Sequence, residues 1–196
     1  MNGHVDVVSA LLGAEANIEV PDNAGHTPLH IAAINGRIGV VRELLRTVAG
    51  RPAANIEARD NDGFTPLHVA AIKGHVDVVR ELLRTDAGRL AANIEAQDNN
   101  KKYTPLHVAA IKGHVRVVRE LLRTDADRPA ANIDAPDGVG RTPLHAAAAN
   151  GQAETVRCLL GCGANTKAKD DAGKTPLLAF QSRRADIVSR LSGRRK

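Results

Sequence analysis

The sequence predicts an all-α repeat solenoid, in which short helix-turn-helix units are stacked side by side. The first observation is internal repetition: residues 65–76 return almost unchanged at 104–115, and weaker copies begin at Thr27, Thr142 and Thr175. The second is composition, since the chain has no Trp, one Tyr and two Phe, so small aliphatic side chains must fill the core. The third is the helical spacing of apolar residues in stretches too short to be stable alone, so that stacking must stabilise them.

The first helix of each repeat is predicted to begin at a Thr-Pro pair. The hydroxyl of Thr65 can cap a helix, and Pro66 then occupies the first helical position, where its missing N–H costs nothing. Ala70 and Ala71 follow at helical spacing and allow a neighbouring helix to approach closely. Gly74 favours a left-handed backbone and is predicted to end this helix.

A second helix is predicted to begin directly after this glycine, and a loop follows it. The buried stripe of the helix is predicted to be Val76, Val79, Leu82 and Leu83. Residues 54–60 and 92–98 then have the pattern Ala-Asn-Ile-Glu-Ala-x-Asp, followed by turn residues such as Asn-Asp-Gly at 61–63. This order predicts an extended segment that enters a tight hairpin before the next Thr-Pro pair.

The whole pattern, from Thr-Pro-Leu-His-x-Ala-Ala-x-x-Gly-His to Leu-Leu, Ala-Asn-Ile and Asp-x-x-Gly, resembles the ankyrin repeat over nearly the whole chain. The resemblance implies antiparallel helix pairs stacked side by side, with β-hairpin loops projecting roughly perpendicular to them. It also implies that partners dock on the hairpin tips and on the concave face of the first helices.

The repeats divide residues 1–196 into one domain with irregular ends. We expect a partial repeat at 1–20, repeats at about 21–58, 59–96, 97–135 and 136–168, and a C-terminal capping repeat at 169–196. The chain opens in the middle of a repeat, so either more repeats precede it in a longer protein or the sequence was cut there. The helix face left uncovered could stack on another copy.

At two places the sequence departs from the regular pattern, and each departure predicts a local change in structure. Three repeats have about five extra residues after Leu-Leu, within 46–55, 84–93 and 123–132. We expect these inserts to lengthen the second helix by about a turn and to widen the loop, in a packing role. The third hairpin, at 98–104, is one residue longer than its neighbours and is expected to bulge away from the row.

The sequence predicts no enzyme, no metal and no cofactor. Seven of the eight histidines are explained by the repeat itself. Those of the Thr-Pro-Leu-His motif should hydrogen-bond to Thr and to neighbouring backbone: His30, His68, His107 and His145. Cys158 and Cys162 are interpreted as surface thiols on the solvated side of a helix, the former in the register of Glu81. Glycines occur where the repeat needs them, and no phosphate loop or nucleophile motif is present.

Charge and hydropathy narrow the class of partner. No apolar run reaches the length needed to cross a bilayer, and two cysteines indicate a reducing interior. A cytoplasmic location is therefore expected, with the nucleus as an alternative.

The basic residues are concentrated at the C-terminus. Residues 183–196 contain six basic residues and one acid, whereas the first 182 contain 21 of each. The net charge of +5 therefore comes from the tail.

Arginine rows suggest a second kind of partner. The rows are Arg42, Arg80 and Arg119; Arg46, Arg84 and Arg123; and Arg51, Arg89 and Arg128. They could follow a phosphate backbone, but Glu43, Glu81 and Glu120 lie between them at pairing distance along a helix. A solvated, self-paired face is therefore favoured over nucleic-acid binding.

The candidate partner-binding residues lie on the hairpins and at the ends of the first helices. The residue before each Thr varies: His26, Phe64, Tyr103, Arg141 and Lys174. The turns add Asn61, Asp62, Lys101 and Lys102, and the first helices add Ile34, Asn35, Ile72, Lys73, Ile111 and Lys112. Aromatic and cationic side chains are typical of binding hot spots, although Phe64 and Tyr103 could equally pack on a neighbouring hairpin.

The sequence therefore predicts a non-catalytic scaffold that binds a protein of unknown identity. If the hairpin row is the site, replacing Phe64 and Tyr103 with Ala removes partner capture without unfolding the protein. Two alternatives stay open: binding of nucleic acid or an acidic surface through the arginine rows and the tail, and a recruiting module of a larger enzyme.

Overall fold

The structure, a computed structural model, describes residues 4–47, 52–85, 91–124 and 129–182. Within these ranges the chain forms α-helices joined by loops, with no residue in a strand. The helices are α1 (Val5–Gly13), α2 (Pro28–Ile34), α3 (Ile38–Leu45), α4 (Pro66–Lys73), α5 (Val76–Leu82), α6 (Pro105–Lys112), α7 (Val115–Leu121), α8 (Pro143–Ala149) and α9 (Ala153–Gly161). A further helical segment covers residues 176–182.

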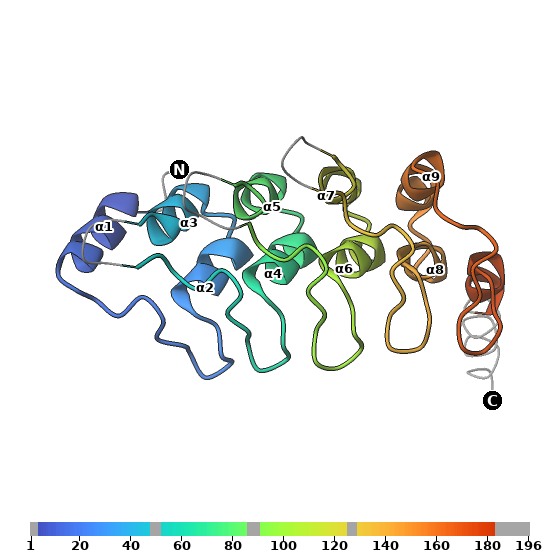
Figure 1. Cartoon of the computed structure of the whole chain (residues 1–196), viewed down its shortest axis with the longest axis horizontal. Coiled ribbons are helices and arrows are strands. Elements are labelled where there is room, and N and C mark those ends of the chain that lie inside the picture. Colours follow the sequence, from blue (N-terminus) through green and yellow to red (C-terminus); the bar gives the residue numbers. More distant parts are fainter. Residues whose placement is uncertain (1–3, 48–51, 86–90, 125–128, 183–196) are drawn as a thin grey trace, which may run out of the picture.

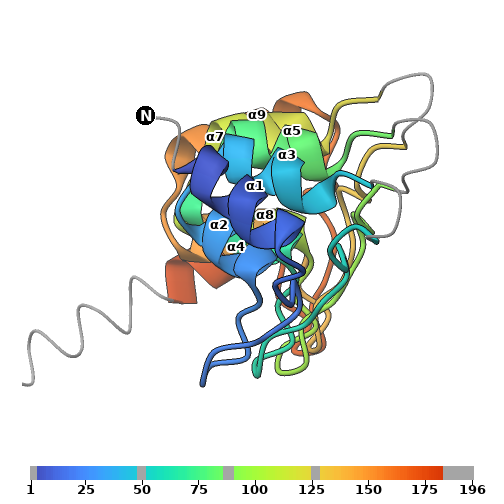
Figure 2. The ribbon, with the colours of Figure 1, turned by 90° about the vertical axis from the view of Figure 1, so that its left-hand side faces the viewer.

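The helices form two layers, and the loops project from one of them. The first helices of the repeats, α2, α4, α6 and α8, lie next to the hairpin loops, whereas α1, α3, α5, α7 and α9 form the other layer (Figure 1). Each first helix packs against the second helix of its repeat and against neighbouring first helices. Seen from the end of the stack, successive repeats lie behind one another (Figure 2). The predicted all-α repeat solenoid is therefore confirmed.

The core consists of small aliphatic side chains that recur in every repeat. Leu67 and Leu106 are fully buried in the first helices, and Ala71 and Ala110 are buried where two first helices meet. All four side chains of the stripe predicted for the second helix of that repeat are buried: Val76, Val79, Leu82 and Leu83. The alanines allow the helix axes to approach closely, which explains how a chain with almost no aromatic residues builds a core.

The buried histidines of the Thr-Pro-Leu-His motif join each repeat to the next, as predicted. The Nδ1 of His68 lies 2.9 Å from Thr65 Oγ1 and accepts the backbone N–H of Thr65 at 3.2 Å. Its Nε2 lies 2.9 Å from the carbonyl oxygen of Tyr103 in the next hairpin. The same bond recurs from His30 to Phe64, from His107 to Arg141 and from His145 to Lys174.

Only the neutral ring can satisfy both partners. A carbonyl oxygen cannot donate, so Nε2 carries the proton and Nδ1 remains an acceptor. Burial lowers the pKa of His68 to about 4, and burial likewise lowers the pKa of His30 and of His107. The motif is thus a structural device that fixes each hairpin on the preceding first helix.

The inserts do not lengthen the second helices, so that prediction is wrong. The helices of the repeats with inserts end at Leu45, Leu82 and Leu121. The helix of the repeat without one, α9, ends at Gly161, in register one residue further than α3 and two residues further than α5 and α7. At the first insert Arg46 already has extended backbone, with φ −74° and ψ 120°. The middle of each insert lies outside the described residues.

One backbone hydrogen bond, which closes the segment after the second helix, explains why the inserts do not lengthen that helix. With an insert, the N–H of Ala92 donates to the carbonyl of Leu82 at 2.8 Å. Without one, the N–H of Ala164 donates to the carbonyl of Leu159 at 3.0 Å. The chain therefore leaves and re-enters the repeat at equivalent points, with or without an insert between them.

Candidate interaction surface

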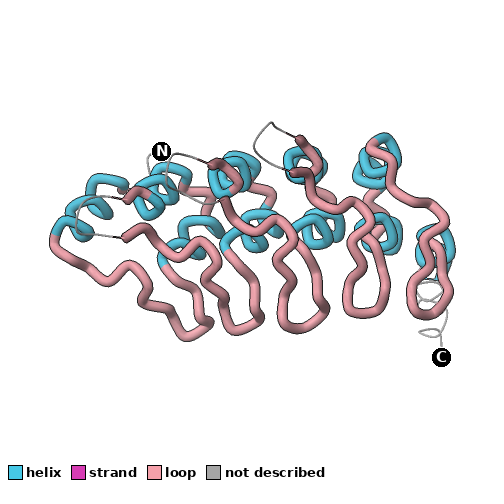
Figure 3. Tube along the Cα trace, viewed as in Figure 1, coloured by secondary structure: helices cyan, strands magenta, loops and turns pink. Residues whose placement is uncertain are grey.

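Each hairpin loop is held by an aspartate, which is buried in the three middle hairpins, at Asp60, Asp98 and Asp137. In the hairpin of residues 60–64, the N–H of Asp60 donates to the carbonyl of Phe64 at 3.0 Å. The Oδ1 of Asp60 in turn accepts the N–H of Asp62 at 3.0 Å and that of Phe64 at 2.8 Å. The carboxylate thus replaces the ladder that two strands would provide, which explains a hairpin shape without assigned strands in the described residues (Figure 3).

Neighbouring hairpins are also bonded to each other. The N–H of Asn61 donates to the carbonyl of Ala24, that of Asn99 to Asp62, that of Gly138 to Lys101 and that of Asp171 to Val139. Gly63 makes one of these close approaches possible, since it has φ +83° and a Cβ there would collide with Asn99. The hairpins therefore form one continuous row.

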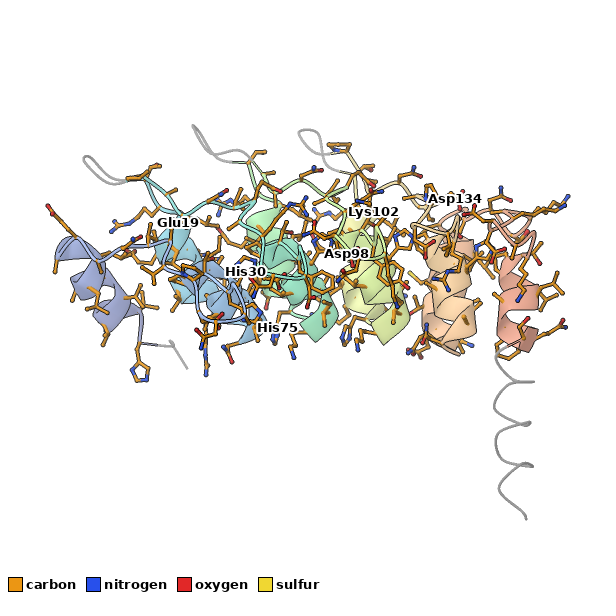
Figure 4. All side chains as sticks on the ribbon, turned by 90° about the horizontal axis from the view of Figure 1, so that it is seen from below. Glu19, His30, His75, Asp98, Lys102 and Asp134 are labelled. Carbon is orange, nitrogen blue, oxygen red and sulfur yellow. The ribbon has the colours of Figure 1, made fainter. Side chains whose placement is uncertain are left out.

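The third hairpin stays in this row, so the expected bulge is wrong. Its residues Asn99 and Lys101 take part in the two bonds to the hairpins on either side. Lys102 absorbs the extra residue by adopting a left-handed backbone, with φ +57°. Asp98 still closes the loop, because its Oδ1 accepts the N–H of Lys101 at 3.0 Å and that of Tyr103 at 2.9 Å. Figure 4 shows Asp98 and Lys102 in this hairpin, viewed from the side on which the loops project.

The five residues that precede each Thr are not equally accessible. His26, Phe64, Tyr103 and Arg141 are half-buried, and Lys174 is exposed. The ring centroid of Phe64 lies 5.6 Å from that of His68, and Tyr103 stacks on His107 at 5.7 Å. Burial raises the pKa of the Tyr103 hydroxyl. Each of these two rings therefore packs on the histidine of the following first helix and stays partly exposed.

The other candidate positions separate into accessible and structural ones. Asn61, Asp62, Lys101 and Lys102 are exposed at the hairpin tips, and Asn35, Lys73 and Lys112 are exposed at or next to the ends of the first helices. Ile34, Ile72 and Ile111 are half-buried, and the first two pack against the core. Their carbonyls accept side-chain bonds from the next repeat, donated by His75 at 3.0 Å, His114 at 2.9 Å and Gln152 at 3.0 Å.

Sequence reasoning did not find this last set of bonds. The residue after each helix-ending glycine was treated only as part of the repeat. Its side chain reaches back to the preceding first helix, and Figure 4 shows His75 at the edge of that layer. The repetition of a hydrogen-bonding side chain at this position is the signal that could have revealed it.

Several arginines of the rows form ion pairs, within a helix as predicted and also between repeats, which the sequence did not predict. Arg46 binds Glu43 at 3.0 Å within one helix, as expected. Arg42 binds Glu81 at 2.9 Å and Arg80 binds Glu120 at 3.0 Å, and both of these pairs join successive repeats. Glu81 and Glu120 are 5% and 6% exposed, so the expectation that this register is solvated is wrong. Arg51, Arg89 and Arg128 lie outside the described residues.

Cys158 ends the row of buried glutamates, because it occupies the position of Glu81 and Glu120 in the fourth repeat. Its side chain is half-buried and that of Cys162 is exposed, and both thiols are free. The expectation of surface thiols therefore fits Cys162 better than Cys158. Burial, followed by the neighbouring Cys158, raises the pKa of the Cys162 thiol.

The N-terminal end of the stack presents an apolar face. Val7 and Leu11 of α1 are each 55% exposed, whereas their equivalents Val78 and Leu82 are buried in the second repeat. Ile31 of α2 is also exposed. These side chains face the position that a preceding first helix would occupy. Stacking of another copy on this face remains a prediction.

Two kinds of site are absent from the described residues. They contain no group of three or more His, Cys, Asp or Glu placed to hold a metal ion. None of their helices combines the length and apolar character that a membrane-crossing segment requires.

Comparison with known proteins agrees with the architecture. The family model described as "Ankyrin repeats (3 copies)" matches residues 1–98, 52–134, 87–170 and 128–194. The search of curated proteins finds no match. Since the overlapping matches span nearly the whole chain, and the structure shows the stacked helix pairs and projecting loops, the chain belongs to the ankyrin-repeat family.

Proposed function

We propose that this chain is a non-catalytic scaffold that binds a protein partner through the hairpin tips and the first-helix face. Ankyrin repeats are generally protein-interaction modules, which supports the coarse assignment. The specific placement rests on the distribution of sequence variation within a nearly uniform repeat. The buried positions and the bonds between repeats recur almost unchanged, whereas the exposed tips differ from one hairpin to the next.

The continuous hairpin row supports this placement. Backbone bonds and the histidine bonds hold each tip relative to its neighbours, so little conformational entropy is lost when a partner binds. Exposed side chains of several repeats can then contact one partner together. The second-helix face carries arginines whose charges are already offset by Glu43, Glu81 and Glu120, which favours the hairpin side over a nucleic-acid track.

Site-specific crosslinking tests the placement without disturbing the fold. A photoreactive amino acid is introduced at Asn35, Lys73 or Lys112, which are exposed. The matched control is the same amino acid at Arg116, an exposed position on the second-helix layer. We expect a partner from a nuclease-treated lysate to crosslink at the first three positions and not at Arg116. Crosslinks at Arg116 alone would move the site to the other face.

The double Ala variant of Phe64 and Tyr103 needs a folding control. Both rings are half-buried and pack against the core, so their truncation is expected to reduce stability as well as to alter the surface. Loss of capture by this variant counts toward the hairpin site only if its melting curve shows that the protein is folded at the assay temperature.

A further inference from the structure

The positive charges on the two faces of the solenoid are neutralised to different extents. On the second helices, Arg42, Arg46 and Arg80 each form an ion pair of 3.0 Å or less. Exposed lysines, by contrast, form no ion pair within the described part of the chain. Four of them lie in the second and third repeats, on the hairpin side, and we call these the lysine patch: Lys73, Lys101, Lys102 and Lys112. The lysine patch is therefore not neutralised by ion pairs within the described residues, whereas on the second-helix layer only part of the charge, such as that of Arg116 and Arg119, is left without one.

The buried aspartates of the third and fourth hairpins bind groups of the protein itself and do not pair with the lysine patch. Asp98 and Asp137 are 2% and 7% exposed, and their carboxylates accept backbone N–H groups of their own loops. Asp137 also binds Arg141 at 3.1 Å. Between residues 97 and 150, no described Asp or Glu is exposed. The exposed acids among the described residues of the second repeat are Asp62, on the neighbouring hairpin, and Asp77, which binds Arg80 at 3.2 Å.

The lysines lie at two places on one side of the stack. Lys101 and Lys102 stand at the tip of the third hairpin, and Lys73 and Lys112 end the adjacent first helices α4 and α6. Apolar groups lie among them: Ile72 and Ile111 are half-buried, and the Lys101 ammonium lies 5.7 Å from the centre of the Tyr103 ring. The surface thus combines exposed lysine side chains with half-buried apolar side chains.

We propose that the lysine patch binds a carboxylate-rich segment of the partner protein. This inference rests on the proposed scaffold function and adds the chemistry of the partner. Lysine is a compact point charge that suits a carboxylate without demanding bidentate geometry, and unpaired surface cations raise the rate and specificity of binding to an acidic segment. The interleaved apolar groups favour a peptide, whose own apolar side chains can cover them, over a nucleic-acid backbone.

A defined probe tests this chemistry. The probe is a fluorescein-labelled peptide of about 12 residues with the repeat Glu-Glu-Ala, and its matched control has Gln-Gln-Ala. We expect the Glu peptide to bind at least about tenfold more tightly than the Gln peptide, and its affinity to fall as salt increases. Lys101→Gln/Lys102→Gln and Lys73→Gln/Lys112→Gln should each weaken binding by about fivefold, whereas Arg116→Gln leaves it unchanged.

Each contrary outcome has its own meaning. Equal binding of the Glu and Gln peptides, or binding that Lys→Gln variants do not weaken, would overturn the acidic-partner inference. If crosslinking at Lys73 and Lys112 still captured a protein, the scaffold proposal would stand without it. Tighter binding of a single-stranded DNA of equal length through the same lysines would assign the patch to nucleic acid instead. Circular dichroism of every variant checks that the fold is intact.

Discussion

The Nε2 of His68 lies 2.9 Å from the carbonyl oxygen of Tyr103, so a neutral imidazole ties one repeat to the hairpin of the next. Because burial lowers the pKa of His68 to about 4, the folded protein holds this ring neutral at pH values where the unfolded chain already binds a proton. Stability from this group is full above pH 6.5 and is lost as the pH falls from 6.5 toward 4.

We therefore predict acid destabilisation in that window. The free energy of unfolding should fall by up to about 1.4 kcal/mol per pH unit for each such histidine between pH 6 and pH 4. Urea unfolding followed by circular dichroism at pH 7.5, 6, 5 and 4 measures it. A His68→Asn variant should be less stable at pH 7.5 and less dependent on pH. Equal pH dependence in both proteins would show that His68 does not control this transition.

Replacing Thr155 with Val should stabilise the protein. Thr155 is fully buried, and its Oγ1 is the one buried side-chain oxygen or nitrogen among the described residues without a hydrogen-bond partner. The equivalent positions in the preceding repeats, Val78 and Val117, carry Val. Removing an unsatisfied hydroxyl should add about 1 kcal/mol to the free energy of unfolding. Thr124→Val, at an exposed site, is the control and should have little effect.

The close approach of two hairpins at Gly63 predicts that Gly63→Ala destabilises the protein more than Gly173→Ala, although both glycines have a left-handed backbone. Gly63 has φ +83° and Gly173 has φ +71°, but a Cβ at Gly63 meets Asn99, whereas one at Gly173 meets nothing within 4 Å. Gly173→Ala should cost about 1 kcal/mol for the left-handed backbone alone. Gly63→Ala should cost at least about 1 kcal/mol more, because the hairpins must also separate. Thermal melts of the two variants compare them, and equal losses would contradict the close approach.

The pair between Arg42 and Glu81 should be asymmetric in its energetics. The side chain of Arg42 is 60% exposed, and that of Glu81 is 6% exposed. Replacing the exposed arginine with Ala should lower the free energy of unfolding by less than about 1 kcal/mol. Glu81→Ala should lower it by more, because it removes a buried side chain and its hydrogen bonds. A double-mutant cycle should give a coupling energy of about 0.5–1 kcal/mol. Additive effects would show that the contact between the two repeats contributes nothing.

Local chemistry made most of the fold predictable, since Thr65, Pro66, His68 and Gly74 each have one structural role that the repeat requires. Comparing repeats with one another was more informative than comparing each residue with its neighbours. The burial of Glu81 was not predicted because helical spacing indicates Arg84 alone as a partner, whereas in the structure Arg42 of the preceding repeat also binds Glu81. Pairing across repeats depends on how the units stack, and a single repeat does not contain that information.

The two departures were mispredicted for a shared reason. Extra residues were expected to extend whatever element they followed. In the structure, fixed bonds on either side set the element, such as those of Asn99 to Asp62 and of Ala92 to Leu82. The extra residue of the third hairpin is absorbed within the loop by the left-handed backbone of Lys102. Which residues of the candidate surface contact a partner depends on the partner, and no pattern in this chain specifies it.

Because of the bond from Ala92 to Leu82, the spacing of the repeats does not depend on the number of residues in each repeat. A segment of five residues and one of ten both join the same two points, as the fourth and second repeats show. The solenoid can thus gain or lose residues at three aligned places while the hairpins on its other side keep their separation. We expect these places to accept a foreign peptide without a change in the proposed binding face.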